Sequence, residues 1–166
     1  MSRAFVKEDV NGPPELPDLP LSPHPNYVTP RGLASLQARL RDTQTTLAQL
    51  RARTERLDKL PEAAAERDIR YLEARLRSAI LVDPARHPGN EVAFGHRVTV
   101  ADPEGVETTY EITGEDEADA SLGRIAPQSP LARALIGAEV GDTVLWRRPT
   151  GAVELEILQI EVPHDP

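Results

Sequence analysis

The 166-residue sequence contains no cysteine, one methionine and few aromatic residues, and its four histidines are scattered singly. The absence of cysteine excludes a disulfide framework and a thiolate metal site, and the scattered histidines form no ligand cluster. No apolar run approaches the ~20 residues that a membrane-spanning helix needs, and the first residues lack the apolar stretch of a secretory signal. We therefore expect a cytoplasmic protein of one or two small domains, without a membrane partner and without a stably bound metal or cofactor.

The net charge of -8 disfavours direct binding to duplex DNA, because such binding depends on neutralising phosphates. The charge is unevenly distributed along the chain. Residues 30–80 contain eleven Lys or Arg and seven Asp or Glu, a net of +4, whereas residues 81–166 contain six Arg and sixteen Asp or Glu, a net of -10. A basic segment followed by an acidic one indicates two modules with different partners. The alternative is that most of these charges are simply solvated.

Prolines concentrate near the N-terminus, where residues 11–25 contain Pro13, Pro14, Pro17, Pro20, Pro23 and Pro25. Proline fixes the backbone angle φ and removes a hydrogen-bond donor, so neither a helix nor a central strand is expected in this stretch. We predict that residues 1–28 are an extended or disordered tail. Two roles are open: its leucines could pack on the chain's own domains, or the tail could be a polyproline ligand for another protein.

Residues 29–83 are predicted to form an antiparallel coiled-coil hairpin. Thr29 and Pro30 are typical of a helix start, and a seam at alternating spacings of three and four residues follows: Leu33, Leu36, Leu40, Thr43, Leu47, Leu50, Thr54 and Leu57. The seam stops at Asp58–Pro61, because proline cannot continue a helix, and resumes with Ala65, Ile69, Leu72, Leu76 and Ala79. We expect helices over about 31–57 and 61–80 that pack within one chain, and hence a monomer.

A different pattern begins after a predicted linker at 84–91. From 92 to 162 apolar residues alternate with polar ones, which is typical of strands, as in Val98 and Val100, Tyr110 and Ile112, and Val153, Leu155 and Ile157. Ser129–Gly137 instead has a cap, a first-turn proline and a terminal glycine, which predict a short helix. The predicted fold class is α+β, with the helical hairpin followed by a small antiparallel β-sheet domain with one helix and a tail at 163–166.

Four blocks in the second half of the chain occur in a fixed order: Gly114–Asp119, Ser129–Gly137, Glu139–Asp142 and Pro149–Glu154. Together they resemble the C-terminal domain of the bacterial transcript cleavage factors GreA and GreB. The resemblance is strong over 97–162 and looser over 27–83. It implies that the sheet domain has an FKBP-like fold.

The resemblance also implies a role for the hairpin tip. In the GreA/GreB family the coiled coil enters the secondary channel of RNA polymerase, where an Asp-x-x-Glu pair helps to hold a second Mg²⁺ that activates water against backtracked RNA. The matching catalytic acids here would be Asp58 and Glu62, sharing Mg²⁺ with the polymerase. They are one residue further apart than in the family, Lys59 follows the first, and the hairpin has lost about one heptad per arm, or ~10 Å of reach. Alternatively, both acids are helix-boundary residues only.

The resemblance also implies which residues bind RNA polymerase. Ser129, Pro130 and Arg133 match residues with which the family contacts the rim of the polymerase channel, although Gln128 stands where the family usually has Asn or Asp. The expected partner is RNA polymerase and, through it, the DNA and RNA of the elongation complex. The alternative for Arg133 is a surface helix residue that pairs with the acidic run 115–119.

The resemblance therefore implies a bacterial transcription elongation factor. Such a protein is not itself an enzyme and at most stimulates the polymerase's own RNA cleavage. One alternative is a regulator that occupies the secondary channel without cleavage. Another is an FKBP-like peptidyl-prolyl isomerase, which would need an aromatic-lined pocket, and residues 92–162 offer only Phe94, Tyr110 and Trp146.

Overall fold

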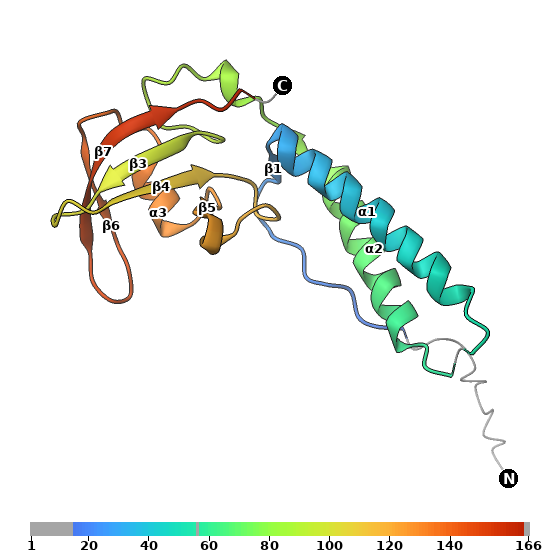
Figure 1. Cartoon of the computed structure of the whole chain (residues 1–166). Helices are drawn as coiled ribbons and strands as arrows, with labels where there is room; N and C mark the ends of the chain where they lie inside the picture. The colour runs from blue at the N-terminus through green and yellow to red at the C-terminus, as the bar shows by residue number, and fades with distance from the viewer. Residues whose placement is uncertain (1–14, 56, 165–166) are drawn as a thin grey trace, which may run out of the picture.

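The computed structural model describes residues 15–55 and 57–164, and a helical hairpin projects from a small β-sheet domain (Figure 1). The hairpin consists of α1 (Pro30–Arg51) and α2 (Leu60–Ser78). These features confirm the predicted α+β fold class. Residues 1–14 and 165–166, which belong to the two predicted tails, lie outside the described residues. In the described part of the chain, no helix has both the length and the apolar character that crossing a membrane requires.

Local signals set the start of each hairpin helix. The Thr29 hydroxyl accepts a hydrogen bond from the Gly32 amide at 3.0 Å, which caps α1, and a proline lies in the first turn of both helices. The two helices pack antiparallel through the predicted seam, with the buried or half-buried side chains of Leu33, Leu36, Leu40, Leu72 and Leu76. The intramolecular hairpin is therefore confirmed.

The first helix is shorter than the seam predicted. α1 ends at Arg51 rather than near residue 57, so Thr54 and Leu57 lie in the loop, and the Leu57 side chain is 89% exposed. The 22 residues of α1 span ~33 Å and the 19 residues of α2 span ~28 Å. Because α2 begins only at Leu60, further turns of α1 would project beyond their partner and bury nothing. The start of the second helix therefore sets the end of the first.

Two short parallel strands close the base of the hairpin. β1 (Tyr27–Val28) precedes α1 and pairs with β2 (Ile80–Leu81), which follows α2. The strand β1 falls within the segment predicted as a tail, whereas residues 15–26 have no regular secondary structure. The predicted linker 84–91 contains one 3-10 turn at Pro84–Arg86.

The sheet of the second domain has the strand order β5-β4-β3-β7-β6. Its strands are β3 (Arg97–Ala101), β4 (Glu107–Ile112), β5 (Arg124–Ile125), β6 (Thr143–Trp146) and β7 (Val153–Glu161). Neighbouring strands pair antiparallel, as predicted, except that β5 pairs parallel with β4. Alternation did not predict β5, because a strand of two residues is too short to show a period.

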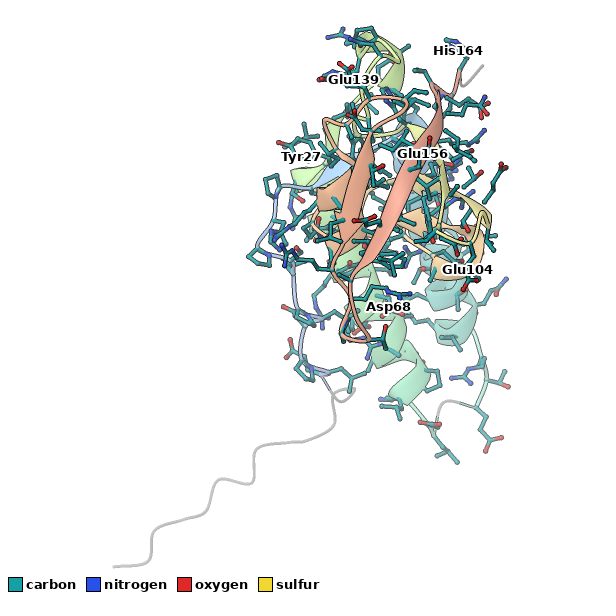
Figure 2. All side chains as sticks on the ribbon, turned by 90° about the vertical axis from the view of Figure 1, so that its left-hand side faces the viewer. Tyr27, Asp68, Glu104, Glu139, Glu156 and His164 are labelled. Atoms are coloured by element: carbon teal, nitrogen blue, oxygen red, sulfur yellow. The ribbon has the colours of Figure 1, made fainter. Side chains whose placement is uncertain are left out.

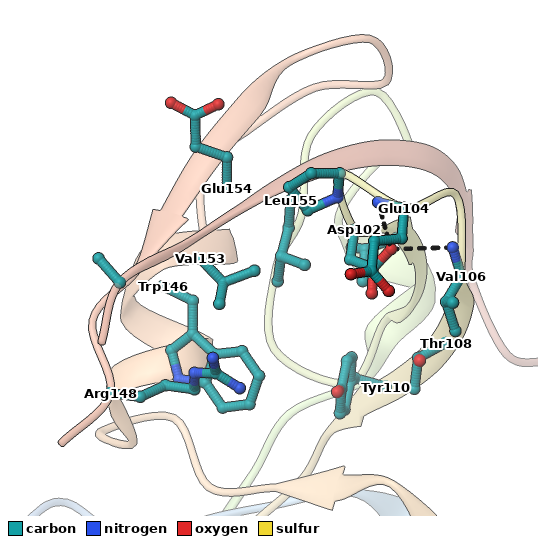
Figure 3. Close-up of a pocket in the computed structure, with 13 residues that line it drawn as sticks. Asp102, Glu104, Val106, Thr108, Tyr110, Trp146, Arg148, Val153, Glu154 and Leu155 are labelled. Atoms are coloured by element: carbon teal, nitrogen blue, oxygen red, sulfur yellow. Dashed lines mark hydrogen bonds between the residues drawn. The ribbon is translucent and has the colours of Figure 1, made fainter. Parts of the chain in front are cut away.

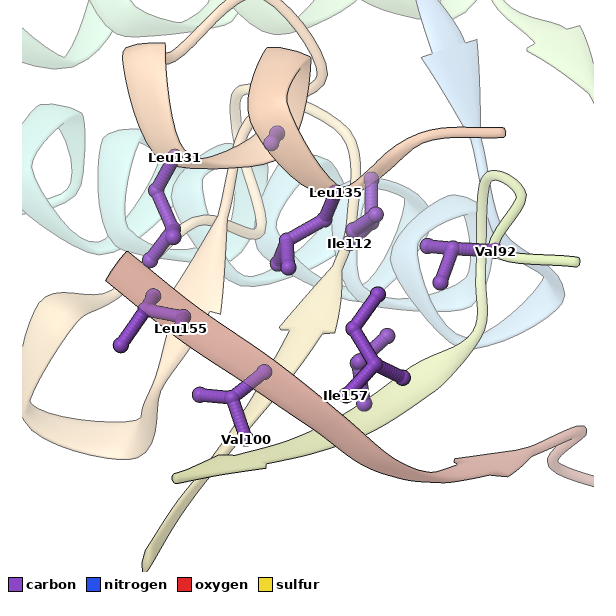
Figure 4. Close-up of a cluster of buried hydrophobic side chains, with 9 residues drawn as sticks. Val92, Val100, Ile112, Leu131, Leu135, Leu155 and Ile157 are labelled. Atoms are coloured by element: carbon purple, nitrogen blue, oxygen red, sulfur yellow. The ribbon is translucent and has the colours of Figure 1, made fainter. Parts of the chain in front are cut away.

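A single helix, α3 (Pro130–Leu135), covers one face of this sheet (Figure 4). The alternating apolar residues of the strands point towards it, and Leu131 and Leu135 face Leu155 and Ile157. The core of the domain consists of these four residues with Val92, Val98, Val100, Ile112 and Ala132. The position of α3 against the sheet fixes which helix residues face solvent.

His96 makes the stability of the sheet domain depend on pH. Its side chain is fully buried, Nδ1 accepts a hydrogen bond from the Ala93 amide at 3.0 Å, and Nε2 has no hydrogen-bond partner among the described residues. Burial lowers the pKa of His96 below its ordinary value. The unfolded chain, with an ordinary histidine near pH 6.5, then binds protons more readily than the folded chain.

We therefore expect the free energy of unfolding to be fully retained above about pH 6.5 and to fall below it, by at most ~1.4 kcal/mol per pH unit. Urea unfolding at pH 7.5 and pH 5.5, followed by the fluorescence of the single tryptophan Trp146, measures this slope. The variant His96→Asn should lose the slope whatever its absolute stability. Equal slopes in the two proteins would assign the pH dependence to other groups.

Candidate functional site

Residues 52–55 and 57–59 lie in the tip of the hairpin, where Asp58 is exposed to solvent. Asp58 Oδ1 accepts a hydrogen bond from the Leu60 amide at 3.0 Å, so its carboxylate caps the start of α2. The nearby apolar side chains of Leu57 and Leu60 are also at the surface, with exposures of 89% and 52%. Sequence reasoning did not identify this apolar tip, since Leu57 had been assigned to the seam.

The second predicted tip acid has a different environment. Glu62 lies in the first turn of α2 and is only 2% exposed. The structure therefore brings Asp58 and Glu62 to the same end of the hairpin but leaves only Asp58 at the surface. Within residues 15–55 and 57–164, no three or more acidic or histidine side chains are grouped so that they could hold a metal ion. The role of the two acids as a pair of metal ligands stays a prediction.

The predicted docking residues lie on the outer side of α3. Ser129 caps the helix, its Oγ accepting a hydrogen bond from the Ala132 amide at 3.3 Å, and Pro130 follows as an exposed first residue. Arg133 is exposed and its guanidinium makes no ion pair with any residue that the structure describes. Pro130 and Arg133 therefore share a solvent-facing surface next to the core.

The acidic run Glu115–Glu117 binds the base of the hairpin instead of Arg133. Arg75 of α2 is 3% exposed, and its Nε donates to Asp116 Oδ2 at 2.6 Å while Nη2 donates to Glu115 Oε2 at 3.3 Å. The Tyr71 hydroxyl, one turn earlier, also donates to Asp116. Burial, reinforced by this hydrogen bond, raises the pKa of Tyr71 to about 12.

The first helix contributes to the same contact between the base of the hairpin and the sheet domain, named here the junction. Arg31 forms ion pairs with Glu117 and Glu111, and the Thr29 hydroxyl donates to Glu117 at 2.6 Å. Gly32 leaves room for this approach, because a Cβ there would lie 2.9 Å from Glu117 Oε1 and the carboxylate would have to shift. The opposite charges of the two modules thus meet at the junction, which accounts for part of the charge asymmetry of the sequence. Other acidic side chains, such as Glu104, Glu139 and Glu156, lie on the sheet domain away from it (Figure 2).

The sheet domain also carries a groove of about 570 Å³ at the end away from the hairpin (Figure 3). Tyr110 and Trp146 lie in it edge to face, with ring centroids 6.4 Å apart. The Arg148 guanidinium lies 5.2 Å from the centre of the Trp146 ring, and the lining also includes the acidic residues Asp102, Glu104 and Glu154. Charged side chains therefore share this groove with the two aromatic rings.

Comparison with known proteins assigns the sheet domain to a family. Residues 87–162 match the family described as transcription elongation factor GreA/GreB, C-term. The sheet domain is therefore similar to a GreA/GreB C-terminal domain. All three predicted docking residues, Ser129, Pro130 and Arg133, lie within the matched residues, whereas Asp58 and Glu62 lie outside them.

Individual relatives agree with the family. The chain is 41% identical over 102 residues to the transcription elongation factor GreA of Pseudomonas putida, covering 60% of this chain and 64% of the relative. It is 47% identical over 95 residues to that of Legionella pneumophila, covering 56% and 59%. The matches thus span less than two thirds of the length of these relatives.

Solved structures cover more of the chain at lower identity. The GreA factor homolog 1 (Gfh1) of Thermus thermophilus is 22% identical, with a TM-score of 0.41, and covers 83% of this chain and 99% of its own. The elongation factor GreA/GreB of Nitrosomonas europaea is 24% identical, with a TM-score of 0.41, and covers 81% and 98%.

Proposed function

We propose that this chain is a bacterial transcription elongation factor that binds RNA polymerase through its GreA/GreB C-terminal domain and places the hairpin in the secondary channel. The observation that carries the proposal is the α3 surface of a GreA/GreB domain, on which Pro130 and Arg133 face solvent and Arg133 has no ion-pair partner in the described chain. An exposed arginine without an internal partner is suited to a charge-assisted contact with another protein. This role would place a monomer in the cytoplasm, in contact with DNA and RNA through the polymerase.

We further propose that the chain regulates the polymerase mainly by occupying the channel, with little or no stimulation of RNA cleavage. Two observations support this reading. The burial of Glu62 leaves Asp58 as one surface carboxylate of the predicted pair, and the shorter arm spans ~28 Å. A single carboxylate already tied to the Leu60 amide is a poor addition to the coordination shell of a Mg²⁺ shared with the polymerase, which needs ligands at ~2.1 Å.

The substitution Arg133→Glu tests the binding surface. We expect it to weaken binding to core RNA polymerase by about tenfold or more (~1.4 kcal/mol), because it reverses the charge of the proposed contact. The matched control is Arg147→Glu, an equally exposed arginine that follows β6 and lies away from α3. Affinities measured by fluorescence anisotropy would distinguish the two.

Each outcome of this experiment bears on a separate part of the proposal. Equal affinities for wild type and Arg133→Glu would remove Arg133 from the interface. No binding by wild type would contradict the elongation-factor function itself.

RNA cleavage is tested separately. Stalled elongation complexes mixed with wild type are expected to keep their RNA length. Strong Asp58-dependent shortening would contradict the proposal that the protein does not stimulate RNA cleavage by the polymerase.

A further inference from the structure

The proline-rich residues 15–25, named here the strap, follow the hairpin from its base towards its tip (Figure 1). At the base the strap continues into Asn26, which is buried and donates from Nδ2 to the Arg75 carbonyl at 2.8 Å. Ser22 Oγ donates to Glu115 Oε1 at 2.7 Å, which ties the strap to the sheet domain as well. The strap therefore has a defined course on the molecule.

The far end of the strap is held by Arg70, half-way along α2. Arg70 Nε donates to Asp18 Oδ1 at 2.5 Å, and Nη2 donates to the Leu16 carbonyl at 2.9 Å. The Asp18 carboxylate is largely exposed, and an exposed ion pair contributes little by itself. The backbone contact at Leu16 matters more, because it fixes the direction of the chain.

Leucine side chains of the strap lie between these two anchors. Leu19 is half-buried and lies over the groove between the two helices, where it lines a cavity with residues of both: Arg39, Asp42, Thr43, Asp68, Tyr71 and Leu72. Leu21 contributes less, because it is 55% exposed. A two-helix hairpin leaves one side of its seam open, and Leu19 covers that side.

Proline makes this arrangement favourable. The strap contains Pro17, Pro20, Pro23 and Pro25, which restrict the backbone before it docks and so reduce the conformational entropy lost on docking. The same restriction suits a polyproline ligand for another protein, but here the Leu16 carbonyl, Leu19 and Asn26 are already engaged with the chain's own hairpin.

We propose that the strap is a third arm of the hairpin, which stays bound when the hairpin enters the polymerase channel and enters with it. The channel-entry part of this inference rests on the proposed function. Arg70 is ten residues from the start of α2, so the strap begins ~15 Å from the tip end of that helix. If the hairpin enters the channel as far as Arg70, the channel must then also receive Leu16–Leu19.

Hydrogen exchange tests the docked strap without polymerase. In the double variant Leu16→Ala/Leu19→Ala, amides of α2 around Arg70–Leu76 should exchange about tenfold faster than in wild type, because the covered seam is opened. The matched control Leu21→Ala, at the exposed leucine, should leave exchange unchanged. Equal exchange in all three proteins would show that the strap does not brace the hairpin, and would overturn the inference.

A steric block tests entry into the channel. A small folded domain inserted into the full chain directly before Glu15 should abolish polymerase binding, whereas the same domain fused after residue 166 should not. Full binding by the chain with the insertion would show that the strap leaves the hairpin on binding, which overturns the inference. The full chain without an added domain is the reference, and its failure to bind would contradict the proposed function while the exchange experiment still decides whether the strap is a third arm.

Discussion

Replacing Arg75 by methionine is expected to lower the free energy of unfolding by about 3–5 kcal/mol, the usual cost of removing one partner of a buried ion pair. The Arg75 side chain is 3% exposed and binds Asp116, Glu115 and Asn26, while the Asp116 side chain is itself only 10% exposed. Without the guanidinium, a largely buried carboxylate loses its counterion, and methionine restores the volume but not the charge.

Two probes can follow the two parts of the molecule in this experiment. Far-UV circular dichroism reports mainly on α1 and α2, and the fluorescence of Trp146 reports on the sheet domain. We expect the two urea transitions to lie closer together in wild type than in Arg75→Met, because the junction partly couples the two parts. The control is Arg77→Met, an exposed arginine two residues away on the same helix. An equally small loss in both variants would show that the junction contributes little to stability.

The contacts of the junction could not be predicted from the sequence. The acidic run 115–119 was recognised as a feature, and the basic character of 30–80 was counted, but nothing in the sequence paired them. The bond between Arg75 and Asp116 joins residues 41 positions apart, and it exists only because the sheet domain seats its loop against the base of the hairpin. Contacts of this kind depend on tertiary packing, which local patterns do not record.

Local signals predicted the elements that carry their own start and stop residues. Ser129 and Pro130 begin α3 as expected, and Pro61 separates the two hairpin helices, because caps and prolines act within one turn. The predicted end of α1 was wrong by six residues, because the seam pattern continues in the sequence beyond the point that lies opposite the start of α2. The sequence also did not predict which of the two tip acids is exposed. An acidic residue in the first helical turn interacts favourably with the helix dipole whether or not its side chain is buried.

The substitution Leu47→Asp is expected to destabilise the tip half of the hairpin by about 3–5 kcal/mol, because it buries a charge without a partner. Leu47 is 7% exposed and lies one turn before the end of α1, far from the junction that Arg75 and Arg31 hold. The damage should therefore be local. Amides in the second half of α1 and the first half of α2 should lose protection from hydrogen exchange, while the Trp146 unfolding midpoint stays unchanged.

Gln44→Asp is the matched control for this local opening. Gln44 is exposed on the same helix, so it introduces the same charge into solvent at little cost. A loss of protection confined to Leu47→Asp would show that the seam, rather than helix propensity, holds the tip together. If the Leu47 variant instead shifted the Trp146 midpoint, the hairpin and the sheet domain would unfold as one unit, and the stability of the tip would be set at the junction. Retained protection in both variants would contradict the packing of Leu47 against α2.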